Sequence, residues 1–237
     1  MAQLTDFKVL SFDVYGTLID WEEGIISNLQ PLLDANNATF SREKLLDVIH
    51  ECERTEQAIK PDLKYHEILA AIHPQVAAKL GLAKPSLDQS NAFGSSVGSW
   101  PAFPDTVAAL KRLRKHFKLV VLSNVDHESF ALSNSSPLEG VKFDLVITAQ
   151  DVGSYKPDLE NFRYMLKEIE EKLGVPKEQI LQTAQSQYHD HQPAKKMGMS
   201  SCWIVRPGSI MGNRSPQVYD WKFDTLGGMA DALEDSQ

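Results

Sequence analysis

The chain has 237 residues, a formal net charge of -8 at pH 7 and 42% hydrophobic residues. This composition allows a sizeable core, as one large domain or as a core with a smaller insert, and excludes a fibrous or disordered chain. The basic residues are dispersed, so no basic stripe can neutralise a nucleic-acid backbone. The N-terminal residues lack a basic segment followed by an apolar run, and no stretch approaches the ~20 apolar residues of a membrane-spanning helix. We therefore expect a cytoplasmic protein that binds neither nucleic acid nor membranes.

Five short apolar runs predict the strands of the core. They cover residues 8–12, 119–122, 145–148, 180–184 and 202–205. Their continuous apolar character is typical of strands buried on both faces, and amphipathic helical stretches separate them. This alternation predicts an α/β fold with a doubly wound parallel sheet, a Rossmann-like core. Ligands bind such sheets beyond the carboxyl ends of the strands, so the polar residues that follow each run are the candidates for a site.

A long helical stretch separates the first run from the second. Ser41 can cap a helix whose apolar residues recur with helical spacing from Leu45 to Cys52. Residues 65–80 predict another helix, which ends near Gly81. Cys52 lies on the first of these apolar faces, and the other cysteine, Cys202, lies in an apolar strand. Two cysteines are too few for a disulfide framework or a zinc site, so we expect both as core thiols.

This helical stretch is too long for an ordinary crossover between strands. We expect residues 20–99 to form a helical cap domain inserted after the first strand, over a Rossmann-like core of residues 1–19 and 100–237. Residues 94–99 are small and flexible in composition, so the return hinge is placed there.

Asp13 follows the first predicted strand, in the sequence Asp-Val-Tyr-Gly-Thr-Leu. A positioned carboxylate can attack a bound electrophile and form an ester intermediate. Gly16 would permit the turn, and Thr17 could contact the site through its hydroxyl or backbone. An ordinary Asx turn closed by Gly16 would account for the same residues.

Ser123 and Asn124 follow the second predicted strand. A hydroxyl and backbone donors there could bind a substrate oxyanion or a leaving group, although turns use the same residue types. Lys156 follows the third strand, before a predicted helix whose first turn holds Pro157 and Asp158. An ammonium beside a carboxylate favours the charged form of both groups, whereas a solvated lysine ahead of a normal helix is the alternative.

Asp190 lies in a polar segment after the fourth predicted strand, ahead of a short helix near Pro193 and Ala194. It could act as an acidic site residue or simply cap that helix. Four such motifs in this order resemble those of the haloacid dehalogenase superfamily, over nearly the whole chain. The resemblance implies a hydrolase in which Asp13 is the covalent nucleophile, Lys156 holds it ionised and Asp190 is the acid of the fourth motif.

Two positions favour one branch of this superfamily. Its phosphatases carry a general-acid Asp where this chain has Tyr15, and a phenol is a poor acid at neutral pH, whereas halide leaves without a proton. They also carry a magnesium-binding Asp where this chain has Ser186, and losing that carboxylate weakens a magnesium site. The first motif is similar to that of the type II (L-2-haloacid) dehalogenases, which are metal-independent. We therefore expect no cofactor and no metal, with magnesium only under a phosphatase alternative.

The chain also departs from the dehalogenases. They hold the substrate carboxylate with a cap Arg, for which Arg54 is the nearest candidate, with a surface role equally open. They place a Tyr where this chain has Phe162, and a Ser and an Asn where it has Gln185 and Gln187, which can still form hydrogen bonds.

The resemblance implies a hydrolytic dehalogenase that acts on small 2-haloacids through an aspartyl ester at Asp13. A phosphatase of the same superfamily and a catalytically inactive small-molecule-binding relative are the alternatives. The expected partner is a small-molecule substrate, and a homodimer is left open. The candidate substrate-binding residues are Tyr15, Thr17, Arg54, Ser123, Asn124, Ser186 and Gln187.

Overall fold

A parallel sheet forms the centre of the protein. The structure is a computed structural model that describes residues 3–213 and 216–236. Its sheet has six strands in the order β3-β2-β1-β4-β5-β6, and every neighbouring pair is parallel. This strand order is that of a doubly wound, Rossmann-like fold, so the predicted fold class is confirmed. The strands are β1 (Val9–Phe12), β2 (Lys118–Ser123), β3 (Leu145–Thr148), β4 (Ile180–Ala184), β5 (Ser200–Ile204) and β6 (Trp221–Phe223).

The strand order determines where a ligand can bind. From β1 the chain adds β2 and β3 on one side and then returns to add β4, β5 and β6 on the other. At such a reversal the loops that follow the two inner strands leave in opposite directions and open a crevice beyond their carboxyl ends. Those strands are β1 and β4, so the segments that begin at Asp13 and Gln185 border the crevice.

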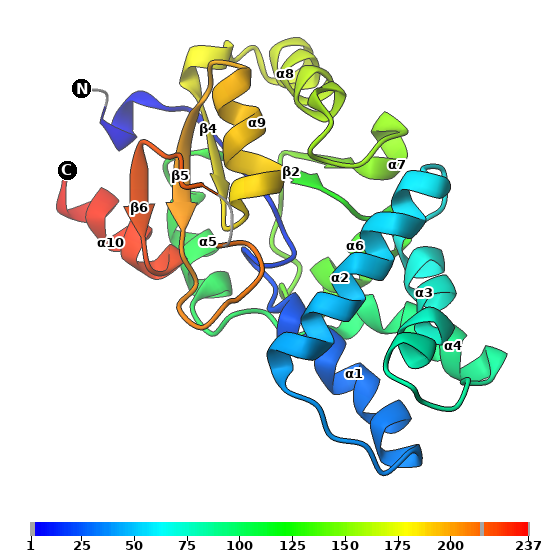
Figure 1. Cartoon of the computed structure of the whole chain (residues 1–237). Coiled ribbons are helices and arrows are strands. Elements are labelled where there is room, and N and C mark those ends of the chain that lie inside the picture. Colours follow the sequence, from blue (N-terminus) through cyan, green and yellow to red (C-terminus); the bar gives the residue numbers. More distant parts are fainter. Residues whose placement is uncertain (1–2, 214–215, 237) are drawn as a thin grey trace.

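Helices flank the sheet, and helices α1 to α4, which follow β1, form a separate group beside it (Figure 1). The α-helices are α1 (Trp21–Ala35), α2 (Arg42–Ile59), α3 (Tyr65–Lys79), α4 (Leu87–Ser95), α5 (Thr106–Leu113), α6 (His127–Ser135), α7 (Ala149–Val152), α8 (Leu159–Leu173), α9 (Gln192–Lys196) and α10 (Leu226–Asp235). Shorter helical turns are η1 (Leu4–Asp6), η2 (Ser96–Ser99), η3 (Lys177–Gln179) and the π-helical turn η4 (Gln187–His191).

Strand β1 is buried on both faces, which explains its continuous apolar sequence. Successive side chains of a strand point to opposite faces of the sheet. Val9 accordingly packs in an apolar cluster with Phe162 of α8, whereas Leu10 and Phe12 pack in a second cluster that includes Leu110 of α5. Layers of helix therefore hold the strand that carries the candidate nucleophile at its end.

The predicted helices between β1 and β2 are confirmed in outline. The Ser41 hydroxyl caps α2 by accepting a hydrogen bond from the Lys44 backbone N–H at 3.3 Å. Residues Leu45 and Cys52 are buried on the inner face of α2, as the helical spacing predicts. Helix α3 ends just before Gly81, which takes a left-handed φ of 71°.

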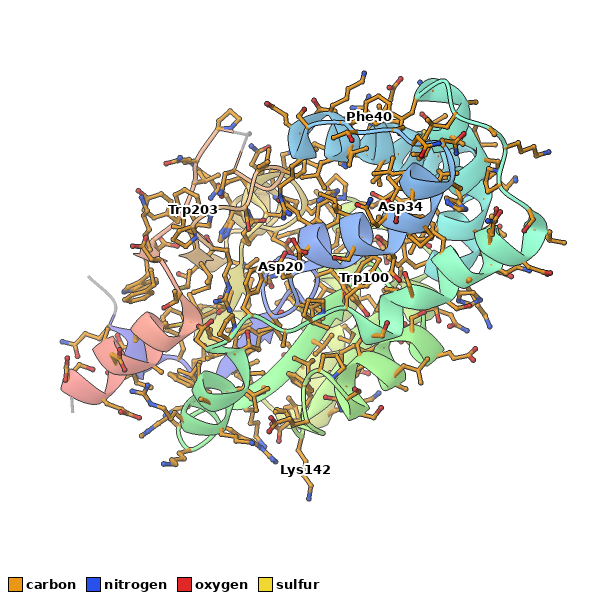
Figure 2. All side chains as sticks on the ribbon, turned by 90° about the horizontal axis from the view of Figure 1, so that it is seen from below. Asp20, Asp34, Phe40, Trp100, Lys142 and Trp203 are labelled. Carbon is orange, nitrogen blue, oxygen red and sulfur yellow. The ribbon has the colours of Figure 1, made fainter. Side chains whose placement is uncertain are left out.

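The chain passes between the sheet and this helical group at two adjacent points. Ile19 and Ala102 form an antiparallel bridge, and the Asp20 N–H donates to the Pro101 carbonyl at 2.8 Å. Figure 2 shows Asp20 and Trp100 near the middle of the protein, where α1 begins. Trp100 is 1% exposed, so the return crossing is packed into the core.

Residues 94–99, where the sequence predicts the return hinge, do not form a loop. This segment is helical, because it comprises the end of α4 and all of η2. A Cβ on Gly98 would lie 2.6 Å from the Leu132 Cβ in α6, closer than real Cβ contacts come. The small residues here allow close packing of η2 against α6.

Other differences concern the ends of elements. Strand β5 begins two residues earlier than predicted and ends at Ile204 rather than at residue 205. Strand β6 was not predicted, because it is three residues long and only partly buried at the sheet edge. Helix α8 begins at Leu159, so Pro157 lies before the helix and Asp158 is its N-cap, which accepts from the Glu160 N–H at 2.9 Å.

Both cysteines are buried and free, as expected for core thiols. Across the described part of the chain, no helix has the length and apolar character needed to cross a membrane.

Candidate active site

Asp13 stands at the carboxyl end of β1 and is 7% exposed. The chain turns sharply after it through Gly16, whose φ of 102° is strained for any residue with a Cβ. The turn brings the Thr17 hydroxyl back to donate to Asp13 Oδ2 at 2.7 Å. Thr17 Oγ1 also accepts from the Gln185 N–H at 2.9 Å, which joins the β1 and β4 loops. Thr17 thus fixes the Asp13 carboxylate.

Lys156 connects the candidate nucleophile to the candidate acid. Its buried Nζ donates to Asp13 Oδ1 at 2.9 Å, to Asp190 Oδ1 at 2.8 Å and to the Leu122 carbonyl at 2.9 Å. All three N–H bonds of the ammonium are therefore used. Burial acts to lower the Lys156 pKa, but the two carboxylates outweigh it and raise the pKa above its ordinary value. Lys156 is a positive charge held between two acids.

Asn124 holds the backbone of Lys156. Its Oδ1 accepts from the Lys156 N–H at 2.7 Å, and its Nδ2 donates to the Lys156 carbonyl at 2.9 Å. Both ends of the Asn124 side chain are thus engaged in positioning the lysine. This role joins the loop after β2 to the loop after β3, and Asn124 also lines the cavity, where the sequence predicts a substrate contact.

Asp190 is completely buried in the π-helical turn η4. Its Oδ1 accepts from Lys156 Nζ and from Gln182 Nε2, the latter at 3.0 Å, whereas its Oδ2 has no hydrogen-bond partner in the described structure. Burial raises the Asp190 pKa to about 7, against the lowering effect of Lys156 and with the help of the Asp13 charge. One lysine cannot neutralise two buried carboxylates, so Asp190 exchanges a proton near neutral pH.

Ser123 ends β2 and is 2% exposed. Its hydroxyl lines the cavity and has no hydrogen-bond partner among the described residues. An unpaired buried hydroxyl is costly, and a polar ligand atom would satisfy it. Ser123 is therefore placed to bind a ligand.

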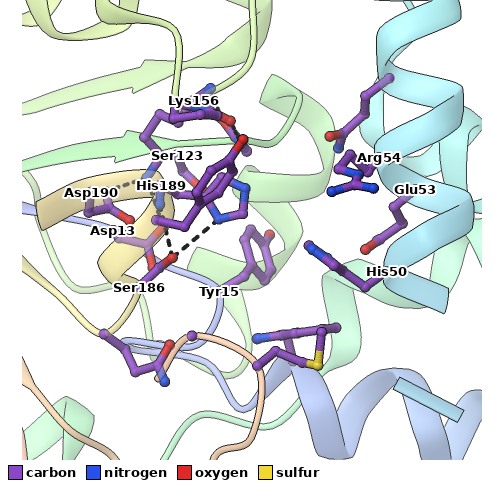
Figure 3. Close-up of a pocket in the computed structure, with 18 of the residues that line it drawn as sticks. Asp13, Tyr15, His50, Glu53, Arg54, Ser123, Lys156, Ser186, His189 and Asp190 are labelled. Carbon is purple, nitrogen blue, oxygen red and sulfur yellow. Dashed lines mark hydrogen bonds and ion pairs between the residues drawn. The ribbon is translucent and has the colours of Figure 1, made fainter. Parts of the chain in front are cut away.

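A cavity of about 380 Å³ lies between these loops and helices α2 and α3. Figure 3 shows Asp13, Ser123, Lys156 and Asp190 on the side of the sheet, with His50, Glu53 and Arg54 facing them from α2. The lining residues that the sequence analysis named are Asp13, Tyr15, Arg54, Ser123, Asn124, Lys156, Pro157, Gln185, Ser186 and Asp190.

Gln187 is a predicted site residue that does not line the cavity. Its side chain is buried, and its Oε1 accepts from the Val218 N–H at 2.8 Å. Its backbone N–H donates to the Gly212 carbonyl at 3.1 Å. Gln187 therefore binds Gly212, which lines the cavity, and Val218, which lies shortly before β6. Thr17 is likewise absent from the lining because it lies behind Asp13.

Tyr15 lines the cavity as a neutral phenol. Its hydroxyl forms a hydrogen bond of 2.8 Å with Ser133 Oγ, and its ring meets the Trp100 ring edge-on with centroids 5.8 Å apart. Burial raises the Tyr15 pKa well above its ordinary value. Tyr15 therefore cannot replace the general-acid carboxylate of a phosphatase at this position.

The residues around Ser186 do not fit a magnesium site. Ser186 Oγ accepts from the His189 N–H at 3.1 Å and lies 3.2 Å from His189 Nδ1. Magnesium prefers carboxylate oxygens, and none replaces Ser186 here. Within residues 3–213 and 216–236, no cluster of three or more His, Cys, Asp or Glu side chains could hold a metal ion.

Apart from Arg54, sequence reasoning missed the residues that α2 and α3 supply to the site. Glu53 is 7% exposed, lines the cavity and accepts from the Tyr65 hydroxyl at 2.7 Å. Burial raises the Glu53 pKa to about 7. His50 lies one turn earlier on the same face, so the spacing of His50, Glu53 and Arg54 was a signal that the sequence contained.

His189 lies at the polar cavity, whereas Phe162 lies in the apolar core. His189 lines the cavity next to Asp190, and burial together with the Lys156 charge lowers its pKa to about 4. Its imidazole is therefore neutral at neutral pH. Phe162, by contrast, is fully buried in the apolar cluster with Met165 and adds no polar group to the site.

Comparisons with known proteins identify a family that the chain resembles. A family model for haloacid dehalogenase-like hydrolases matches residues 7–181. The (S)-2-haloacid dehalogenase H-109 of Pseudomonas putida is 26% identical over 213 residues, which cover 84% of this chain and 86% of that protein. An (S)-2-haloacid dehalogenase of Pseudomonas sp. strain YL is 25% identical over 240 residues, which cover 96% and 94%.

A solved structure gives the same result for the fold. The L-2-haloacid dehalogenase from Xanthobacter autotrophicus, with chloropropionic acid covalently bound, matches with a TM-score of 0.76 at 17% identity, over 98% of this chain and 100% of that chain. The family model spans most of the sequence, and the sheet and helices follow the same fold. The chain therefore belongs to the haloacid dehalogenase-like hydrolases.

Proposed function

We propose that the protein hydrolyses the carbon–halogen bond of 2-haloacids through an ester formed on Asp13. The observation that carries this proposal is the buried Lys156 ammonium, which contacts both Asp13 and Asp190. It joins a nucleophile and a second acid in one site that lacks a phosphatase's general acid and metal-binding carboxylate. The names of the relatives from Pseudomonas support the choice of substrate class.

In the first step an Asp13 oxygen attacks the halogen-bearing carbon of the substrate. A carbon–oxygen bond forms, and the carbon–halogen bond breaks with both electrons leaving on the halide. Because halide is a stable anion, this step needs no general acid, which agrees with the neutral phenol of Tyr15 beside the nucleophile. Lys156 and Thr17 hold the two Asp13 oxygens in place for attack.

In the second step water attacks the ester carbonyl carbon of Asp13. Asp190 accepts a proton from this water, the carbonyl oxygen becomes an oxyanion beside the Lys156 ammonium, and collapse releases the 2-hydroxyacid as its oxygen takes up a proton. The overall reaction consumes one water and yields hydroxyacid, halide and a proton. An acid with a pKa of about 7 suits this transfer, because it is substantially deprotonated at neutral pH and basic enough to accept the proton.

Two groups are placed to bind the substrate carboxylate. Ser123 offers an unpaired hydroxyl beside the nucleophile, and Arg54 offers a guanidinium from an exposed position on α2 that still lines the cavity. We therefore propose that residues 20–99 act as a cap domain over a core of residues 1–19 and 100–237. The substrate would bind between them.

The experiment that tests the proposal is a panel that measures halide release from (S)-2-chloropropanoate and phosphate release from sugar phosphates, each with and without a chelator. We expect halide release that the chelator leaves unchanged, because Ser186 supplies no carboxylate for magnesium. Magnesium-dependent phosphate release without halide release would contradict the proposal and favour the phosphatase alternative.

A further inference from the structure

The wall of the cavity opposite Asp13 is polar. His50, Glu53 and Gln57 of α2 all line it. Their spacing of three and four residues places them on one face of the helix. The chemistry proposed at the Asp13 end, attack on carbon and hydrolysis of an ester, gives these three side chains no role.

Glu53 has one oxygen available within this wall. Its Oε1 accepts from the Tyr65 hydroxyl at 2.7 Å, and no other described residue donates to its carboxyl. The side chain is 7% exposed, so water can reach little of it, and that little faces the cavity. The second Glu53 oxygen can therefore accept a hydrogen bond from a ligand in the cavity.

An aromatic surface leads from the nucleophile to Glu53. The Tyr15 ring, two residues after Asp13, lies 6.3 Å from the Tyr65 ring, centroid to centroid. Tyr65 is the residue whose hydroxyl contacts Glu53, and both tyrosines line the cavity. A flat apolar group could pack on these rings while its far end reached Glu53.

The size of the cavity agrees with such an arrangement. A volume of about 380 Å³ falls within the range of roughly 300–1,000 Å³ that encloses drug-sized ligands. A haloacid of two or three carbons is much smaller than that. The His50 ring also lies 6.4 Å from the His189 ring beside Asp190, so α2 bounds the same space as the reacting groups.

We infer that Glu53 is a specificity-determining residue that recognises the hydroxyl group of a 2-haloacid bearing a hydroxylated aromatic side chain. The inference rests on the proposed function and names the substrate class of that same site. In this pose the haloacid end lies at Asp13, the aromatic ring packs on Tyr15 and Tyr65, and the terminal hydroxyl contacts Glu53. A hydroxyl both donates and accepts hydrogen bonds, so it pairs with Glu53 in either protonation state.

The test compares kcat/KM for halide release from three probes: (S)-2-chloropropanoate, (S)-2-chloro-3-phenylpropanoate and its 4-hydroxyphenyl analogue. The unmodified protein should favour the hydroxyphenyl over the phenyl substrate by about tenfold or more, as expected for a hydrogen bond to a charged or strongly polar buried group. Glu53→Leu should bring this ratio close to one. Glu53→Gln, which keeps an acceptor and a donor, should restore most of the preference.

Glu51→Gln is the matched control, because Glu51 lies on α2 but is exposed and pairs with Lys79. It should keep the full preference. The inference would be overturned if the unmodified protein showed no preference for the hydroxyphenyl substrate, or if Glu53→Leu kept the preference of the unmodified protein. Halide release from chloropropanoate would then still support the proposed function. Failure to release halide from all three probes would instead overturn the proposed function and the inference with it. If Glu53→Leu does not fold, the ratio of kcat/KM for the hydroxyphenyl and phenyl substrates in the unmodified protein still tests the inference.

Discussion

Replacing Lys156 with methionine removes one buried positive charge at nearly constant side-chain length. In the native site this charge is shared by Asp13 and Asp190, at 2.9 and 2.8 Å. Its loss leaves two carboxylates enclosed without a counter-charge. We expect Lys156→Met to lower halide release by at least about 100-fold, because the ammonium orients the nucleophile and stabilises the oxyanion of the second step.

The same substitution should destabilise the fold. Removing one partner of a buried ion pair costs about 3–5 kcal/mol. At roughly 2–4 °C per kcal/mol for a chain of this size, a loss of about 3 kcal/mol lowers Tm by roughly 6–12 °C.

The loss of stability in Lys156→Met should grow as pH rises. Lys156 lowers the Asp190 pKa, so without it that pKa rises above about 7. An acid whose pKa is higher in the folded than in the unfolded state favours folding at low pH, and that advantage disappears as pH rises through the folded-state pKa. The variant should therefore lie closer to the wild type at about pH 5.5 than at about pH 8.

Thermal denaturation of both proteins at the two pH values measures these effects. Lys167→Met is the control, because Lys167 is exposed and its nearest carboxylate contact, to Glu171, is 3.9 Å long. An unchanged Tm in Lys156→Met, together with an unchanged rate of halide release, would refute the bridging role of Lys156.

Two further outcomes test the roles of Asp190 and Ser123. Because Asp190 must be deprotonated to accept a proton from water and its pKa is about 7, hydrolysis of the ester should slow by roughly tenfold per unit as pH falls below that value. Acid quenching and mass spectrometry would detect the ester, and equal decay at about pH 5.5 and about pH 8 would exclude Asp190 as the base. Ser123→Ala should raise KM about fivefold without lowering Tm, since its hydroxyl gives up no internal hydrogen bond. An unchanged KM would remove Ser123 from substrate binding.

The sequence predicted the catalytic end of the site because parallel strands end at the same edge of a sheet. Asp13, Ser123, Lys156 and Asp190 each follow a predicted strand, so the order of strands alone brings them together. The hydrogen bonds from Lys156 to Asp13 and Asp190 join segments that all leave this edge of the sheet. These residues were therefore the easiest to predict without a structure.

Contacts between distant elements were harder to predict. The role of Gln187 depends on residues before β6, a strand too short to predict, and so its side chain was expected in the site rather than behind it. Glu53 is an ordinary helical glutamate in sequence, and only the packing of α2 over the sheet buries it at the cavity. Gly98 was interpreted as flexible because composition does not distinguish a hinge from a close helix contact.

The central claim is that an oxygen of Asp13 becomes the oxygen of the product. A single turnover of (S)-2-chloropropanoate in H₂¹⁸O, with the protein in excess, tests it directly. The account predicts unlabelled lactate and ¹⁸O in the peptide that contains Asp13, with Asp13→Asn releasing no halide at all. Lactate that carries ¹⁸O from the first turnover, with an unlabelled Asp13 peptide, would show that water attacks the substrate directly and would contradict the account.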